Sequence, residues 1–213
     1  MMIDTAGMSG TAIYHLMTQT LIPRPIAWVL TKHTSGHLNL APFSYFTAVT
    51  SEPPLLMFSV GNKVDGSGKD TKVNAQENGY FVVHIPSGRH AEAVTESSRA
   101  LPAAESELDR LNHIKTVPFE GFPLPRLEDC AIAFGCRLHH THAIPGAPQT
   151  LLFGEIKRVY LADEVARIQH LQKGDGQISE RLVVSAQDVD PLARLGADEY
   201  ARLGEFLRVP RPK

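Results

Sequence analysis

Two stretches decide the fold of this chain: Pro23-Arg24-Pro25-Ile26-Ala27-Trp28-Val29-Leu30-Thr31 and Asn39-Leu40-Ala41-Pro42-Phe43-Ser44-Tyr45-Phe46. The first is rich in apolar, β-branched and aromatic residues from Ile26 to Thr31. The turn-forming Thr34-Ser35-Gly36 follows, so we expect a strand that enters a hairpin. Cations, hydroxyls and aromatic rings recur in both stretches, and such groups suit a ligand with a phosphate, a polyol and a flat ring.

Strands dominate the rest of the chain. Further strands are predicted at Phe43–Thr50, Leu55–Val60, Tyr80–Ile85, Ala131–His139, Gln149–Leu161 and Leu182–Ser185. A helix is expected after the glycine-rich loop Gly61–Gly68, with Ser67 as its cap, Asp70 completing a capping box and Gly79 at its end. Shorter helices are predicted at Ser87–Ser98, Glu105–Leu111, Arg167–Gln172 and Asp198–Leu207.

This order of elements predicts a mainly β protein. Hairpin-like connections outnumber helical crossovers, which favours a closed antiparallel β-barrel with helical additions and no exposed sheet edges. The 213 residues contain no internal repeat or linker, so we expect one domain over residues 1–213. Its barrel core would cover about 20–162 and a C-terminal extension about 163–213.

Composition narrows the class of protein. Hydrophobic residues make up 43% of the chain and charged residues 21%, as in ordinary globular domains. The net charge of −2 argues against binding to nucleic acid or to an anionic membrane surface. No apolar run approaches the roughly 18 residues of a membrane span, and no signal peptide is apparent at the start.

The two cysteines, Cys130 and Cys136, are expected to stay reduced. On an extended strand they would share one face but lie roughly 20 Å apart, too far for a disulfide. Reduced cysteines without a signal peptide predict a cytoplasmic protein.

The triplet Lys69-Asp70-Thr71 stands at the first turn of the helix expected after Gly68. Unpaired N–H groups and the helix dipole favour an anion there, with Lys69 adding charge and Thr71 a hydroxyl. Asp70 would repel a phosphate and so is expected to cap the helix or bind backbone. An ordinary solvated helix start explains the same triplet, and taken alone it is the commoner case.

Other residues of the opening block have similar alternatives. Arg24, held extended between two prolines, suits bidentate contact with a phosphate, and equally a surface ion pair. Ser44 and Ser59 face a polar ligand or, more commonly, bind local backbone. Trp28 and Phe43 are expected in the core, whereas the hydroxyl of Tyr45 makes it the better candidate to face a ligand ring.

The order of these motifs resembles one known family. The motifs are Arg24–Val29, Asn39–Phe46, Pro53-Pro54, Phe58-Ser59, Lys69-Asp70-Thr71 with Asn74, Gly79–His84, Gly154-Glu155 and Ala193–Gly196. In this order they are similar to the flavin reductase-like, FMN-binding split-barrel family, and they extend over nearly the whole chain. One departure is His84, where an asparagine is more usual.

The resemblance implies a six-stranded antiparallel Greek-key split barrel that forms a homodimer and binds FMN noncovalently near the interface. It implies that Arg24, Ser59, Lys69 and Thr71 hold the phosphate and ribityl chain. Along the isoalloxazine ring it places Thr31 and the segment from Asn39 to Phe46, with Ala41 and Ser44 nearest. The complete set of implied cofactor residues is Arg24, Thr31, Asn39, Ala41, Pro42, Phe43, Ser44, Tyr45, Phe46, Ser59, Lys69, Asp70, Thr71 and Asn74.

The resemblance also implies an oxidoreductase in which the flavin carries the chemistry and no protein nucleophile is needed. NADH or NADPH would donate hydride, and an acceptor or a partner monooxygenase would receive the electrons. The alternative is an FMN-binding electron-transfer protein with little nicotinamide activity of its own.

A metal site is the remaining hypothesis. His139, His140 and His142 lie close in sequence, and on a strand His140 and His142 share a face. No Cys-x-x-Cys or His-Glu-x-x-His pattern accompanies them, so surface or loop histidines are the favoured interpretation and no metal is expected.

Overall fold

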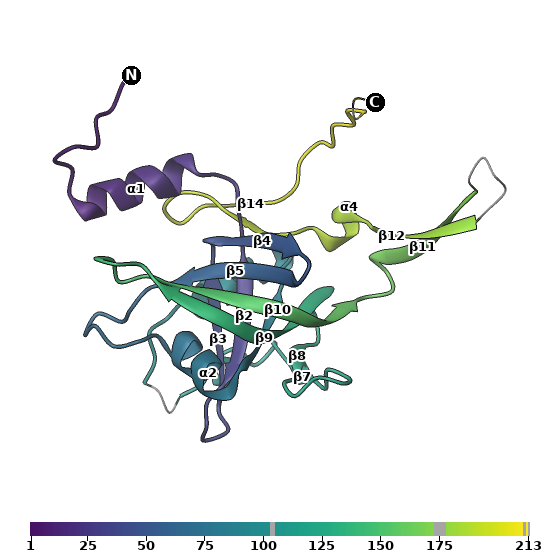
Figure 1. Ribbon diagram of the computed structural model, residues 1–213, viewed down its shortest axis with the longest axis horizontal. Helices are drawn as coiled ribbons and strands as arrows, with labels where there is room; N and C mark the ends of the chain where they lie inside the picture. The colour runs from purple at the N-terminus through teal and green to yellow at the C-terminus, as the bar shows by residue number, and fades with distance from the viewer. Residues whose placement is uncertain (103–104, 173–177, 211, 213) are drawn as a thin grey trace.

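The centre of the molecule is a seven-stranded antiparallel sheet with the order β3-β2-β6-β9-β10-β5-β4 (Figure 1). The computed structural model describes residues 1–102, 105–172, 178–210 and 212. The end strands β3 and β4 are consecutive in the chain and are separated by Ser44 and Tyr45 alone. The sheet therefore curls until its two ends meet. Its strands are β2 (Ala27–Lys32), β3 (Leu38–Phe43), β4 (Phe46–Ser51), β5 (Pro54–Val60), β6 (Tyr80–His84), β9 (Ile132–Ala143) and β10 (Thr150–Leu161).

Alternate residues of the sheet fill the barrel interior. From β2 and β6 this inner cluster takes Ala27, Val29, Phe81 and Val83, all fully buried. Phe81 packs edge-on against Phe58 of β5, with ring centroids 5.4 Å apart. Gly154 of β10 makes room for this ring, because a Cβ at that position would overlap Phe81. The close approach of Phe81 gives the Gly154-Glu155 motif a packing reason.

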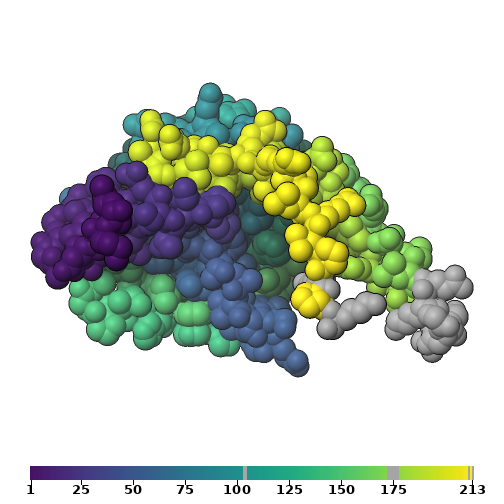
Figure 2. Space-filling view, turned by 90° about the horizontal axis from the view of Figure 1, so that it is seen from above, coloured from purple at the N-terminus to yellow at the C-terminus, as the bar shows by residue number. Residues whose placement is uncertain are grey.

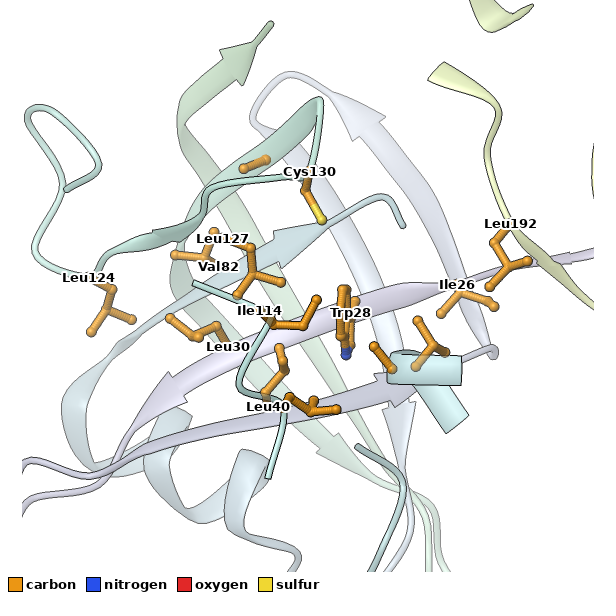
Figure 3. Packing of buried hydrophobic residues seen from close by; sticks show 14 of the residues in the cluster. Ile26, Trp28, Leu30, Leu40, Val82, Ile114, Leu124, Leu127, Cys130 and Leu192 are labelled. Atoms are coloured by element: carbon orange, nitrogen blue, oxygen red, sulfur yellow. The ribbon is translucent and has the colours of Figure 1, made fainter. Parts of the chain in front are cut away.

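The other face of β2 and β6 is buried as well. Trp28, Leu30 and Val82 belong to a second cluster, formed with residues of the segment 85–130 that crosses this side of the sheet. Trp28 lies among Ile26, Leu30, Leu40 and Ile114 (Figure 3). Burial on both faces explains the unbroken apolar run in β2, since alternation with polar residues is expected only where one face meets water.

Shorter elements surround the barrel. The helices are α1 (Gly10–Thr20), α2 (Asp70–Asn78), α3 (Ala91–Glu96), α4 (Ala186–Val189) and the 3₁₀ turns η1 (Gly88–His90) and η2 (Glu107–Asp109). The remaining strands are β1 (Arg24–Pro25), β7 (Thr116–Val117), β8 (Arg126–Leu127), β11 (Ala166–Gln172), β12 (Ile178–Val184), β13 (Ala193–Arg194) and β14 (Tyr200–Ala201). The β11–β12 hairpin projects from one end of the molecule (Figure 1).

The C-terminal segment returns to the start of the chain. β1, β13 and β14 form a small sheet in which Arg24 lies opposite Arg194. Figure 2 shows this segment, in yellow, lying across the molecule beside the purple N-terminal helix. The segment around β13 is thereby packed beside α1 and β1, outside the barrel.

The mainly β prediction is confirmed, with two corrections to its strands. The large sheet has seven strands rather than six. The predicted strand Phe43–Thr50 is broken at Ser44-Tyr45, where the chain passes from β3 to β4. The prediction has no separate range for β3, which is the second strand of the hairpin that begins with β2.

Several helix predictions are wrong. Arg167–Gln172 is not a helix but part of β11, because pairing with β12 satisfies its backbone. The segment Asp198–Leu207 contains β14 and no helix. Helix α1, which Ser9 caps by accepting the N–H of Ala12, is absent from the predicted elements.

Both cysteines are buried and unpaired, as predicted. They do not share a face, however: Cys130 precedes β9 and packs in the outer cluster, whereas Cys136 lies in the barrel interior. Burial raises the pKa of the Cys130 thiol to about 12 and that of Cys136 further still, so neither is a thiolate at neutral pH. Across the described residues, no helix combines the length and the apolar character that crossing a membrane requires.

His84 joins two layers of the structure. Its Nδ1–H donates to the carbonyl of Trp28 at 3.0 Å, and its Nε2 accepts the N–H of Leu127 at 2.9 Å. These two bonds hold the neutral imidazole between the barrel and the segment that covers it. Burial lowers the pKa of His84 to about 3, and burial also lowers the pKa of the neighbouring His90 to about 4.

We predict that His84 makes the fold sensitive to acid. The unfolded chain binds a proton at His84 below its ordinary pKa of 6.5, whereas the folded chain does not until about 3. The free energy of unfolding should therefore fall as the pH drops through this window. In urea titrations at several pH values, the free energy of unfolding of His84→Gln should fall less steeply with decreasing pH than that of the wild type. Parallel pH profiles for the two proteins would contradict the assignment.

Candidate functional site

A cleft of about 670 Å³ opens between β3, the first turn of α2, the 3₁₀ turn η2 and two loops. Its size lies within the range of small-molecule sites. Seven of the residues predicted to bind a cofactor line it: Asn39, Ala41, Pro42, Phe43, Lys69, Asp70 and Thr71. The cleft is further lined by Asn62, Lys63, Val64, Asp65, the segment 97–101 and Glu107.

The N-terminus of α2 enters the cleft without a side-chain cap. The helix begins at Asp70, with Lys69 in extended conformation as its N-cap residue and no hydrogen bond from that side chain. Ser67 does not cap it, so the predicted capping box is wrong. Instead, the N–H and hydroxyl of Ser67 both donate to Asp65 Oδ1, at 2.9 and 2.6 Å. An uncapped helix start leaves N–H groups and a positive dipole end available to an anion.

Charges around this helix start are unevenly compensated. Lys63 forms an ion pair with Asp70, with Nζ and Oδ1 2.7 Å apart. Within the described part of the chain, no ion pair involves Lys69. Asp70 thus balances Lys63 rather than Lys69, and the charge of Lys69 remains for a ligand.

Two side-chain hydrogen bonds fix the polar wall of the cleft. Asn39 Nδ2 donates to Thr71 Oγ1 at 2.9 Å, which ties β3 to α2. Behind it, Asn74 Nδ2 donates to Thr31 Oγ1 at 3.1 Å, which ties α2 to β2. Thr31 and Asn74 are buried behind the cleft rather than lining it.

Unpartnered acceptors remain in this region. The Oδ1 atoms of Asn62 and Asn74 are buried without a hydrogen-bond partner. A buried acceptor without a hydrogen-bond partner destabilises the folded protein, so such atoms are rare in native structures. Asn62 lines the cleft, and a ligand hydroxyl there would satisfy it.

The sequence did not predict the cleft residues 97–101 and Glu107. Ser97 accepts the Nε1–H of Trp28 at 2.9 Å, and Arg99 forms a two-pronged pair with Glu96. Glu107 Oε2 accepts the N–H of Leu40 at 2.9 Å. These residues lie far from the opening block in sequence and carry no recognisable motif. Asn62 and Lys63, in contrast, belong to a glycine-rich polar loop directly before α2, which could have suggested them.

Arg24 lies outside the cleft, and its guanidinium is directed to backbone carbonyls. Nη1 donates to Thr18 O and, at 2.9 Å, to Leu21 O, while Nη2 donates to Leu195 O at 2.7 Å. Its Nε donates to Ser44 Oγ at 3.4 Å. The structure therefore assigns Arg24 to the junction of α1, β1 and the C-terminal segment.

Three further predicted residues, Tyr45, Phe46 and Ser59, lie outside the cleft lining. Ser59 N–H donates to Tyr45 O at 2.9 Å, and Phe46 lies opposite Phe58 in the sheet. Their side chains are partly exposed and do not line the cleft. They extend its β3 wall toward β4 and β5.

The histidines of β9 contact one another and a ring of the next strand. His139 and His140 approach within 2.8 Å through their Nδ1 atoms, and His140 stacks on Phe153 with centroids 4.2 Å apart. Among the residues that the structure describes, no three His, Cys, Asp or Glu side chains are grouped as metal ligands would be.

Comparison with known proteins identifies the family. The profile of the Flavin reductase like domain matches residues 18–178. The chain belongs to the flavin reductase-like family. An uncharacterized protein of Halalkalibacterium halodurans is 35% identical over 212 residues, which cover all of this chain and 97% of that one.

Solved structures of this family share the fold. Component B of nitrilotriacetate monooxygenase from Bacillus cereus is 31% identical and superposes with a TM-score of 0.82, covering 98% of both chains. The 2-nitrobenzoate 2-nitroreductase of Pseudomonas fluorescens is 27% identical with a TM-score of 0.80, covering 100% of this chain and 96% of that one. The seven-stranded sheet is thus the split barrel of flavin reductase-like proteins, and these relatives support an oxidoreductase.

Proposed function

We propose that this flavin reductase-like protein binds FMN in the cleft and transfers hydride from NADH or NADPH to the flavin. The observation that carries the proposal is the uncapped start of α2, where Lys69 has no ion-pair partner among the described residues and Thr71 lines the same wall. Helix N-termini of this kind bind phosphate through backbone N–H groups and the dipole. In the cleft, the start of α2 adjoins a lining that is largely apolar.

Lys69 and Thr71 would hold the phosphate. Thr71 is oriented by the hydrogen bond from Asn39, which leaves its own hydroxyl proton available for donation. The pair of Lys63 and Asp70 lies beside this site and keeps Asp70 compensated, which reduces its repulsion of a phosphate.

The β3 wall would hold the rest of the cofactor. Ala41, Pro42 and Phe43 present a flat, mainly apolar surface for the ring. Asn62 Oδ1 would accept a ribityl hydroxyl, since it has no other partner. Thr31 and Asn74 support this wall from behind. Ser44, Tyr45, Phe46 and Ser59 continue it and stay proposed contacts, whereas Arg24 contributes by holding Ser44.

Bound FMN would supply the hydride chemistry, and the chain would supply binding and orientation. The similarity to component B of a monooxygenase supports a partner monooxygenase as the acceptor of electrons. The similarity to a nitroreductase supports direct reduction of a small molecule. The second candidate is an FMN-binding electron carrier that reacts slowly with nicotinamides.

The first experiment follows the colour of the protein. Purified protein incubated with FMN and desalted should be yellow, and anaerobic NADH or NADPH should bleach it. A yellow protein that neither nucleotide bleaches would favour the electron carrier. Failure to retain or bind FMN would contradict both candidates.

Replacing Lys69 tests the phosphate site. Lys69→Ala should weaken FMN binding by roughly 10- to 150-fold, because a charge-assisted hydrogen bond contributes about 1.5–3 kcal/mol. The melting temperature of the apo protein should hardly change, since Lys69 is exposed. Lys72→Ala is the matched control, with the same loss of charge on α2 but outside the cleft lining. Equal FMN affinity in both variants would count against the assignment.

We further propose a homodimer, supported by the β11–β12 hairpin. Ile168 and Leu182 lie opposite each other on one face and are each 53% exposed, with Ile178 on the same face 71% exposed. The pair His170–Glu180 lies between them on this face. A two-stranded hairpin is marginally stable alone, and exposed apolar side chains that are grouped with polar ones can mark a contact surface. We propose that a second copy of the chain packs against this face of the hairpin.

Sedimentation velocity should therefore give a dimer for the wild type. The double variant Ile168→Glu/Leu182→Glu should be a folded monomer, because two buried carboxylates would oppose association. Val64→Glu, at an exposed residue of the cleft loop, is a control for added charge. A monomeric wild-type protein would contradict the homodimer, and a dimer unaffected by the double change would exclude this hairpin as its contact.

A further inference from the structure

Glu107 is a buried carboxylate in the wall of the cleft. The residue is the first of η2 and is 7% exposed. Glutamate is seldom buried to this extent unless it is paired with a cation. In the described part of the chain, Glu107 forms no ion pair.

The one hydrogen bond described for its carboxylate is to a backbone amide. Oε2 accepts the N–H of Leu40, while the hydroxyl of the preceding Ser106 donates to Leu38 O at 2.6 Å. Both contacts are made to β3, the strand at one end of the sheet order. Glu107 therefore covers the β3 edge and places its charge beside the wall proposed to hold FMN.

The charged groups around Glu107 do not neutralise it. Asp70 on α2 opposes its negative charge and Lys63 favours it, but these two are paired with each other. Lys69, Asp65 and Arg99 line the same cleft, and Arg99 is paired with Glu96. Burial raises the pKa of the Glu107 carboxyl above its ordinary value; the hydrogen bond from the Leu40 N–H opposes this rise, and the charge of Asp70 adds to it.

We propose that Glu107 takes up a proton when the cleft binds FMN, so that FMN affinity rises as the pH falls. The inference rests on the proposed function, because it takes FMN as the ligand. An anionic ligand brings negative charge toward Glu107 and displaces water from it, and both changes favour the neutral carboxyl. The neutral carboxyl can also donate a hydrogen bond to a carbonyl oxygen of the ring.

Glu107→Gln tests this coupling without removing the contact to β3, because the glutamine amide oxygen can still accept the Leu40 N–H. Titration calorimetry with FMN, in buffers of different ionisation enthalpy, gives the protons bound per FMN. Wild-type protein should take up more protons than Glu107→Gln at pH values above the ordinary glutamate pKa. Titration of the FMN phosphate itself is common to both proteins and cancels in the difference.

At pH values well above the ordinary glutamate pKa, Glu107→Gln should bind FMN about tenfold more tightly than the wild type, because the neutral amide needs no proton. Glu105→Gln, an exposed residue of the same segment paired with Arg110, should behave as the wild type.

Two results would overturn the inference. One is the same proton uptake in Glu107→Gln and wild type. The other is loss of FMN binding in Glu107→Gln at every pH while its melting temperature is retained, since the charged carboxylate would then be the binding form. If wild-type protein fails to bind FMN at all, the proposed function itself is contradicted. A purely structural Glu107 would change the melting temperature of Glu107→Gln without changing proton uptake.

Discussion

Burial of β2 on both faces is the constraint on which the rest of the structure depends. Ala27 and Val29 fill the barrel, while Trp28 and Leu30 fill the layer outside it, and all four are fully buried. This arrangement requires a covering segment on the outer side, and the residues from about 85 to 130 provide it. His84 then joins the two layers through the carbonyl of Trp28 and the N–H of Leu127. The hydrophobic effect sets the layers, and this pair of hydrogen bonds aligns them.

The cleft follows from where β2 ends and β3 begins. Thr31 holds Asn74, and Asn39 holds Thr71, so two hydrogen bonds attach α2 to the hairpin. The first turn of α2 is consequently held at the edge of the cleft, without a side-chain cap. Ser67, which could have capped this turn, is directed to Asp65 instead. A helix start held rigidly and left uncapped is what an anion site needs.

Local sequence pattern was sufficient for the barrel and for seven of the residues that line the cleft. β2 and β6 are apolar runs with strong β propensity, and Gly79 ends α2 in left-handed conformation as its type predicts. The helix predicted at Arg167–Gln172 was wrong because this segment forms a strand by pairing with β12, and local propensity does not reveal that partner. Arg24 is predicted to contact a phosphate from its charge and stiffness, and in the structure its guanidinium donates to distant carbonyls such as Leu195 O, which local sequence does not show. Glu107 could not be found because its role depends on packing against β3, far away in the sequence.

The most direct test of the central claim, that the start of α2 is a phosphate site, compares FMN with riboflavin. The two share the ring and ribityl chain and differ in the phosphate alone, so their affinities for wild-type protein isolate its contribution. Fluorescence titration should show FMN binding about 100-fold or more tightly than riboflavin, as expected for two charge-assisted contacts. Equal affinities for the two flavins would contradict the account.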